Sequence, residues 1–223
     1  MNIWMDENYV YTATSSGSDI IDIESERNYA YIHYSDGFTS IWGNNTTVFF
    51  GTAASGIKYF SKSNLTGDLN TPIDLTDYLR DFKSYPNITS NNIRHLHGRD
   101  DKLMCCTMAG VDFFKLDPQG YRSSTTVSGA DKCFVTPGRN VYYTTYSGGE
   151  YRINKLNHAL IDWSEPHEVY NIQAGLKIND LFVTENTSVG GTKNTLFIAT
   201  TSGIYVVDEK TFDTDVYYTY NGA

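Results

Sequence analysis

The segment Leu196-Phe197-Ile198-Ala199-Thr200, followed by Gly203, contains the pattern that decides the fold. Two or three apolar residues lead to a small residue and a threonine, and a glycine follows three or four positions later. The same pattern occurs four times earlier in the chain, at Val10–Thr14 with Gly17, Val48–Thr52 with Gly56, Leu103–Thr107 with Gly110, and Val141–Thr145 with Gly148. The chain therefore contains five tandem repeats.

Each repeat predicts a β-hairpin. An apolar strand ends near the threonine, and the glycine supplies the positive φ of a tight turn. Alternating apolar residues follow the glycine, as in Ile204–Val207, and this alternation is typical of a returning strand.

Further apolar stretches flank every hairpin. Those before the hairpins are Ile3–Met5, Ser40–Trp42, Ile93–Leu96, Cys133–Val135 and Leu181–Val183. Those after the hairpins are Tyr29–Tyr34, Ile73–Leu79, Tyr121–Val127, Glu168–Ile172 and Asp215–Tyr220. Four antiparallel strands form one propeller blade. We therefore expect an all-β, five-bladed β-propeller, in which residues 1–223 form one domain with blades at about 1–36, 37–88, 89–129, 130–174 and 175–223.

The composition excludes several classes of protein. The net charge of −9 and the lack of a basic stripe disfavour a nucleic-acid partner, because the chain would repel phosphates. No apolar window approaches the roughly 18 residues of a spanning helix, so we expect no membrane insertion. Since no basic segment precedes an apolar run at the N-terminus, we also expect no signal peptide.

The units resemble two-component-regulator propeller repeats, in which an Ile-led strand and an acidic turn precede a core of the form Leu-Trp-Ile-Gly-Thr-x-x-Gly-Leu. The best matches are Ile93–Val111 and Ile178–Ile204, and Phe, Tyr or Met replaces the tryptophan of the core. The resemblance implies a propeller architecture. It implies no particular function, because enzymes, sensors, lectins and scaffolds share such repeats.

Few residues suggest chemistry. Asp6 and Asp180 lie on expected innermost strands, where propeller glycosidases place an acid/base pair, but the other three strands carry little acidic character. His95 and His97 share one face of a strand as a metal pair would, but a third ligand is missing. We therefore expect no catalytic, cofactor-binding or metal-binding residues and no cofactor.

Cysteines and tyrosines complete the candidates. Cys105, Cys106 and Cys133 form an odd, sparse set without CxxC spacing, and this pattern predicts buried, reduced thiols. Strand alternation predicts that some tyrosines are exposed, where they would contact proteins or sugars; the candidates are Tyr142, Tyr143, Tyr146, Tyr151, Tyr217, Tyr218 and Tyr220.

These observations favour a non-enzymatic structural and interaction propeller. The Tyr-, Asn-, Thr- and Gly-rich composition resembles that of phage neck, tail and fibre-associated proteins. We therefore expect a virion component, assembled in the host cytoplasm, that docks to other virion proteins. The alternative is a carbohydrate-binding propeller, either lectin-like or receptor-binding, and a glycosidase is the least favoured interpretation.

Overall fold

The protein is built from β-strands, as expected. The computed structural model describes residues 1–67, 69–82, 88–116, 119–125, 129–135, 141–156, 167–171, 176–188, 191–208 and 214–219. Within these residues the only helices are two short 3₁₀ turns, η1 (Lys62–Asn64) and η2 (Thr76–Tyr78). No helix in the described part has the length and hydrophobicity needed to cross a bilayer. The chain contains two compact units, Met1–Thr126 and Val127–Ala223.

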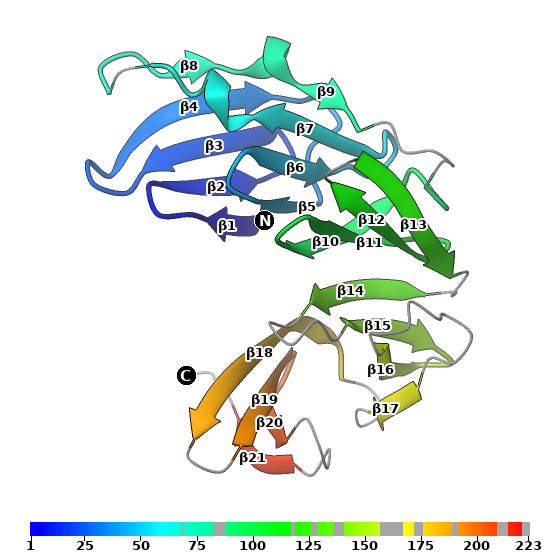
Figure 1. Ribbon diagram of the computed structural model, residues 1–223. Coiled ribbons are helices and arrows are strands. Elements are labelled where there is room, and N and C mark those ends of the chain that lie inside the picture. Colours follow the sequence, from blue (N-terminus) through cyan, green and yellow to red (C-terminus); the bar gives the residue numbers. More distant parts are fainter. Residues whose placement is uncertain are drawn as a thin grey trace. The chain divides into compact units, whose positions relative to one another are not determined.

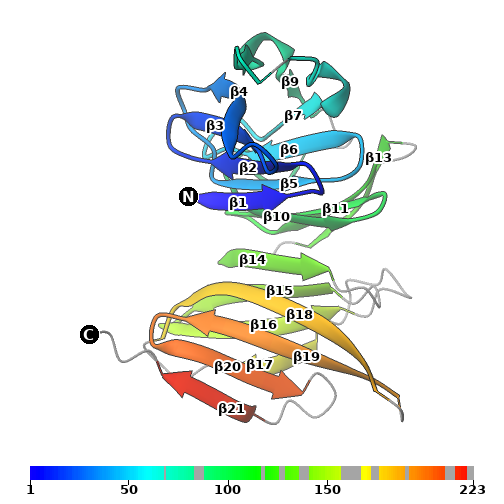
Figure 2. The same ribbon diagram turned by 90° about the vertical axis from the view of Figure 1, so that its left-hand side faces the viewer.

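The first unit contains three sheets, each of which begins with at least three consecutive strands (Figure 1). The first sheet has β1 (Asn2–Met5), β2 (Tyr9–Ala13), β3 (Gly17–Asp22), β4 (Arg27–His33) and β8 (Ile73–Asp74). The second has β5 (Ser40–Gly43), β6 (Thr47–Gly51), β7 (Ile57–Ser61) and β9 (Arg80–Asp81). The third has β10 (Ile93–Arg99), β11 (Lys102–Thr107), β12 (Val111–Leu116) and β13 (Gln119–Thr125). Strand β5 contacts both β1 and β10, so the first strands of the three sheets are neighbours (Figure 2).

The second unit contains two more sheets of the same kind. One has β14 (Ala130–Val135), β15 (Val141–Ser147), β16 (Glu150–Leu156) and β17 (His167–Asn171). The other has β18 (Ile178–Ser188), β19 (Gly191–Thr200), β20 (Gly203–Asp208) and β21 (Thr214–Thr219). Their first strands, β14 and β18, are in contact. All five predicted hairpins are therefore confirmed, while the closure of the sheets into one ring stays a prediction.

A hydrogen bond explains why threonine and glycine recur together. In four of the five repeats the threonine Oγ1 donates to the carbonyl oxygen of the glycine. The distances are 2.9 Å for Thr14 and Gly17, 2.9 Å for Thr52 and Gly56, 3.1 Å for Thr107 and Gly110, and 2.9 Å for Thr200 and Gly203. The threonine thus closes the turn twice in three of these repeats, because the backbone N–H of Thr14, Thr52 and Thr107 donates to the same carbonyl oxygen at 2.9, 3.0 and 2.8 Å.

The fourth repeat departs from this arrangement. The expected turn between Thr145 and Gly148 is wrong by two residues, because the strands continue until Ser147 pairs with Glu150. Gly148 and Gly149 form the turn at φ values of 64° and 90°. Two successive glycines at positive φ favour the two-residue hairpin loop, which matches the twist of the strands.

The predicted fourth strand of the second repeat, Ile73–Leu79, is also wrong. Its start, β8, pairs in parallel with β4 of the first sheet, and the fourth strand of the second sheet is β9. Leu75 accounts for the difference: its side chain is fully buried in the core that the first sheet forms with β6 and β7, and its N–H donates to the carbonyl oxygen of Tyr31 at 2.9 Å.

Tryptophan-on-glycine contacts join the sheets of the first unit. Trp4 of β1 packs against Gly43 of β5, where a Cβ atom would lie 2.7 Å from the indole. Trp42 of β5 packs in the same way against Gly98 of β10, also at 2.7 Å. Only glycine allows the strand to approach the indole so closely. Both pairs occupy the same register positions in successive sheets, so the repeat extends to the packing between sheets.

Candidate binding groove

An open groove of about 1490 Å³ crosses one edge of the first unit. It is lined by the turns that join the first and second strands of the three sheets, Asp6–Asn8, Asn44–Thr46 and Arg99–Asp101. Apolar side chains, among them Trp4, Trp42, Tyr59 and Phe82, also line the groove. Equivalent parts of three repeats therefore build one surface.

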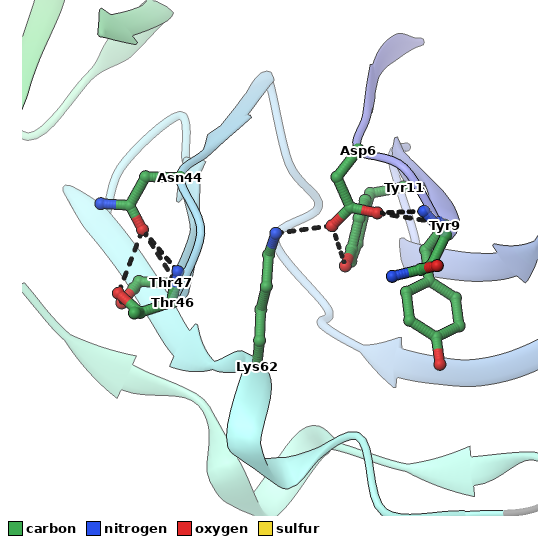
Figure 3. Close-up of polar contacts among 8 residues, drawn as sticks. Asp6, Tyr9, Tyr11, Asn44, Thr46, Thr47 and Lys62 are labelled. Carbon is green, nitrogen blue, oxygen red and sulfur yellow. Dashed lines mark hydrogen bonds and ion pairs between the residues drawn. The ribbon is translucent and has the colours of Figure 1, made fainter. Parts of the chain in front are cut away.

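Two of the turns have the same internal hydrogen bonds (Figure 3). Asp6 Oδ1 accepts from the backbone N–H groups two and three residues ahead at 2.9 and 2.8 Å. Asn44, at the equivalent position of the second sheet, accepts from the corresponding N–H groups at 3.0 and 2.9 Å. Short polar side chains that bond the backbone ahead of them hold such turns in one conformation. The turns therefore present their tips as fixed features.

The third turn is charged. Asp101 lies 3.2 Å from Lys102 Nζ and 3.9 Å from Lys115 Nζ. Asp100, at the tip, is exposed and has a positive φ of 54°. Arg99, at the position equivalent to Asp6 and Asn44, lines the groove and has no ion pair within the described part of the chain.

A polar cluster bridges the first and second sheets. Lys62 follows β7, and its backbone N–H donates to the carbonyl oxygen of Thr46 at 2.8 Å. Its side chain reaches back to the first sheet, where Nζ lies 2.5 Å from Asp6 Oδ2 and 4.7 Å from the centre of the Trp4 ring (Figure 3). Tyr11 donates its hydroxyl to the same Oδ2 atom at 3.0 Å. The side chains of Lys62 and Asp6 are only 15% and 20% exposed.

The cluster shifts the pKa values of its members. Partial burial alone would raise the pKa of Asp6, but hydrogen bonds from Lys62, two backbone N–H groups and Tyr11 outweigh burial and hold the pKa below its usual value. Burial and the Asp6 carboxylate raise the pKa of Tyr11 well above its usual value. Tyr9 also has a raised pKa, about 12, because it is partly buried and close to Tyr29. At neutral pH Asp6 is therefore a carboxylate, and Tyr9 and Tyr11 are neutral phenols.

The equivalent junction between the second and third sheets is apolar. There Leu116 takes the place of Lys62: it ends β12, the third strand of its sheet, and its N–H donates to the carbonyl oxygen of Asp101 at 2.6 Å. Leu116 packs with the cluster of Trp42 and Phe49. The charged pair at the first junction is therefore an addition to the repeat.

The structure places the sequence-based candidates on different elements. Asp6 lies in the groove, whereas Asp180 is an exposed residue of β18 whose carboxylate accepts from the backbone N–H of Leu181 at 2.9 Å. His95 is buried on β10, and the pKa of His97 is lowered to about 4, mainly by burial and also by Arg99. Among the described residues, no three His, Cys, Asp or Glu side chains are grouped as a metal ion requires.

The cysteine prediction is confirmed, and the tyrosines include buried and exposed residues, although their division does not follow strand alternation. Cys105, Cys106 and Cys133 are buried thiols. Tyr142 and Tyr143 are buried, while Tyr146 is 48% exposed and packs on Tyr151 at 4.7 Å between ring centres. Residue 220 and the side chains of residues 217 and 218 lie outside the described part of the chain.

Outside the groove, Asp112 of β12 is fully buried. Its Oδ2 accepts from the N–H and hydroxyl groups of Thr89 at 3.0 and 2.8 Å, while Oδ1 has no hydrogen-bond partner among the described residues. Burial raises the pKa of Asp112 despite the two bonds from Thr89. The carboxyl group is therefore held in a site that disfavours its charge.

Several solved structures have a similar fold. Two are crystal structures of the extracellular domain of BT4673 from B. thetaiotaomicron, described once as a one-component system and once as a hybrid two-component system. They are 14% identical to this chain, with TM-scores of 0.64 and 0.62, and the matches cover 98% and 99% of it. This chain spans 29% of the length of each of those domains.

A third similar structure is the computationally designed Ika8 protein, which is 13% identical to this chain with a TM-score of 0.57. That match covers 97% of this chain and 73% of Ika8. No protein-family model and no curated protein matches the chain. Likeness at this level of identity concerns the fold alone. It fits the resemblance of the repeats to two-component-regulator propeller repeats.

Proposed function

We propose that the protein is a non-enzymatic interaction module that docks to a partner protein through the groove of its first unit. The observation that carries the proposal is that three equivalent turns line a single groove. Two of these turns are held by internal hydrogen bonds, so little conformational entropy would be lost when a partner binds. The volume of about 1490 Å³ exceeds the range of about 300–1,000 Å³ typical of small-molecule sites and suits a segment of a protein.

The lowered pKa and the hydrogen bonds of Asp6 support a non-catalytic role. A general acid of a glycosidase needs a raised pKa, so that it holds a proton at neutral pH. The pKa of Asp6 is lowered instead, and both of its carboxylate oxygens already accept hydrogen bonds. Asp6 therefore suits a structural role in the groove better than proton transfer.

The proposed architecture is the closed five-bladed ring. The two ends of the repeat series support it, because each exposes apolar residues at positions that are covered elsewhere. Met5 holds the register position of Gly43 and is 61% exposed, and Phe182 holds that of Trp4 and is 56% exposed. In a closed ring Phe182 would cover Met5 as Trp4 covers Gly43.

An engineered disulfide between positions 5 and 182 tests whether the ring is closed. Met5→Cys combined with Phe182→Cys should form an intramolecular bond under mild oxidation, seen as a faster band on a non-reducing gel. Met108→Cys, also exposed at 59%, replaces Met5→Cys in the control and should give no such band. Cross-linked dimers without the faster band would contradict ring closure.

The proposed location is a virion, and the composition supports it. Mass spectrometry of purified particles from the phage that encodes the chain should detect the protein. Asn45→Trp, at the tip of the second turn, should lower its incorporation, whereas Ala54→Trp, at the opposite end of β6, should not. If the protein is missing from the particles, the virion role is wrong, and equal incorporation of both variants would exclude the groove.

A carbohydrate-binding role is the second candidate. The observation that favours it is the mixture of aromatic rings and amide side chains in the groove, including Trp4, Tyr59, Asn44 and Asn45. Such mixtures bind sugars through ring contacts and hydrogen bonds. A glycan array probed with the wild type and with Asn45→Trp tests this candidate, which predicts a signal that the substitution removes.

A further inference from the structure

The hydrogen-bond acceptors deep in the groove are already used. Each oxygen of the Asp6 carboxylate accepts two bonds, two from backbone N–H groups and two from Lys62 and Tyr11. The oxygen of Asn44 accepts three bonds, two from backbone N–H groups and one from a threonine hydroxyl at 3.2 Å. The carboxylate of Asp101 faces two lysines. A partner that offers only donors would therefore find few acceptors there.

The donors are still free. The amide nitrogen of Asn44 carries two protons and has no partner within the described part of the chain (Figure 3). Arg99 carries five guanidinium N–H donors and has neither an ion pair nor a hydrogen bond among the described residues. These two residues hold the same turn position in neighbouring sheets. The unused hydrogen-bonding groups described here are therefore donors on neighbouring turns.

The charges point in the same direction. Asp6 and Lys62 neutralise one another, and Asp101 shares its charge with Lys102 and Lys115. Around the third turn, Arg99, Lys102 and Lys115 carry three positive charges, and Asp100 and Asp101 carry two negative charges. The chain as a whole carries −9, so this donor-rich turn, with one net positive charge, is an exception on an acidic molecule.

We propose that the groove recognises a carboxylate-bearing segment of a partner protein, with Arg99 as the main determinant of specificity and Asn44 as a second donor. This inference rests on the proposed function. The planar guanidinium of Arg99 suits two parallel bonds to a carboxylate. The aromatic lining contacts apolar residues beside it. Glu7 and Asp100, exposed at the tips of two turns, repel a polyanion such as a nucleic acid.

A peptide selection tests the proposal. Random dodecapeptides displayed on a carrier are selected on the wild-type protein and eluted with the soluble chain. We expect the recovered peptides to be enriched in Asp and Glu. A synthetic peptide from the selection should bind at least about tenfold more weakly after Arg99→Gln, or after Glu→Gln in the peptide, since a hydrogen bond to a charged group contributes about 1.5–3 kcal/mol.

Matched controls make the result specific. Arg27→Gln removes an exposed arginine of β4 outside the groove and should leave the affinity unchanged. Arg99 has no ion pair within the described ranges, so circular dichroism of Arg99→Gln should match that of the wild type. The proposal is overturned if the peptides show no enrichment in carboxylates, if none binds the groove, or if oligo-dT binds more tightly than they do.

Docking through the groove and carboxylate specificity can be refuted by different results. If Asn45→Trp abolishes incorporation into particles while the selected peptides bind independently of carboxylates, the docking groove stands and the carboxylate specificity is wrong. If the peptides depend on Arg99 and incorporation is unaffected by Asn45→Trp, the groove is a carboxylate site and the proposed docking in particles is wrong.

Discussion

The contact between Trp4 and Gly43 makes a quantitative prediction about how the sheets are joined. In Gly43→Ala the new Cβ would lie 2.7 Å from two indole carbons and 3.1 Å from the Thr47 carbonyl oxygen. Carbon atoms in contact normally lie about 3.5–4.0 Å apart, so the indole must move by about 1 Å. Lys62 lies over one face of the ring, and Tyr11 packs beside it at 5.1 Å, so the movement disturbs both.

The expected cost follows from two opposing terms. Overpacking of this kind costs about 1–3 kcal/mol. Alanine in place of glycine within a strand returns about 0.5–1 kcal/mol of backbone entropy. We therefore expect Gly43→Ala to lower the free energy of unfolding by about 1–2 kcal/mol, measured by urea denaturation with circular dichroism.

A double-mutant cycle separates the indole contact from other effects. Trp4→Leu removes the atoms that meet the new Cβ, so Gly43→Ala should cost much less in that background. The coupling free energy between the two sites should be about 1 kcal/mol or more. Equal costs of Gly43→Ala in the two backgrounds would refute the view that the indole requires a glycine at this position.

Three further predictions concern the repeat, the groove and the buried acid. Thr52→Val removes the hydroxyl that donates to the Gly56 carbonyl at 2.9 Å, and we expect a loss of about 1–2 kcal/mol in urea denaturation, with no change if the bond contributes nothing. Lys62→Met leaves Asp6 without its ammonium partner. Because the pKa of Asp6 is lowered in the folded state, the stability that this carboxylate contributes is present at neutral pH and is lost as the pH falls through the folded pKa. The wild type should therefore lose more stability than the variant on acidification. Asp112 has a raised pKa in the folded state, so the stability that its protonated form contributes is fully present below about pH 3.8 and is lost as the pH rises through the folded pKa. The buried charge then costs stability at pH 7, so the free energy of unfolding of Asp112→Asn should compare more favourably with that of the wild type at pH 7 than at pH 4. The opposite order would contradict a raised pKa.

The hairpins could be predicted because their signal is local. Threonine and glycine lie three or four residues apart, and one hydrogen bond joins them in four repeats. The same rule ended the fourth strand two residues too early, at Thr145, because Gly148 and Gly149 together make a two-residue loop and the strand continues to Ser147. A second glycine next to the first was the available signal.

The contacts between sheets were harder to predict. Lys62 and Asp6 are separated by 56 positions, and no periodic pattern connects them. The assignment of Ile73–Leu79 to the second sheet failed because Leu75 is buried against the first sheet, a tertiary preference that local alternation does not reveal. The Trp4–Gly43 and Trp42–Gly98 pairs were not predicted either, although each tryptophan and each glycine lies at a fixed distance before a repeat threonine.

The position of the partner in the groove is the central claim, and photo-cross-linking tests it most directly. Benzoylphenylalanine is placed at Asn45, at the tip of the second turn, or at Ala54, at the other end of β6, and assembling particles are irradiated. We predict that Asn45 cross-links to one particle protein, that a selected carboxylate peptide suppresses the product, and that Ala54 does not yield it. The same product from Ala54, or none from Asn45 in particles that contain the protein, would contradict docking through the groove.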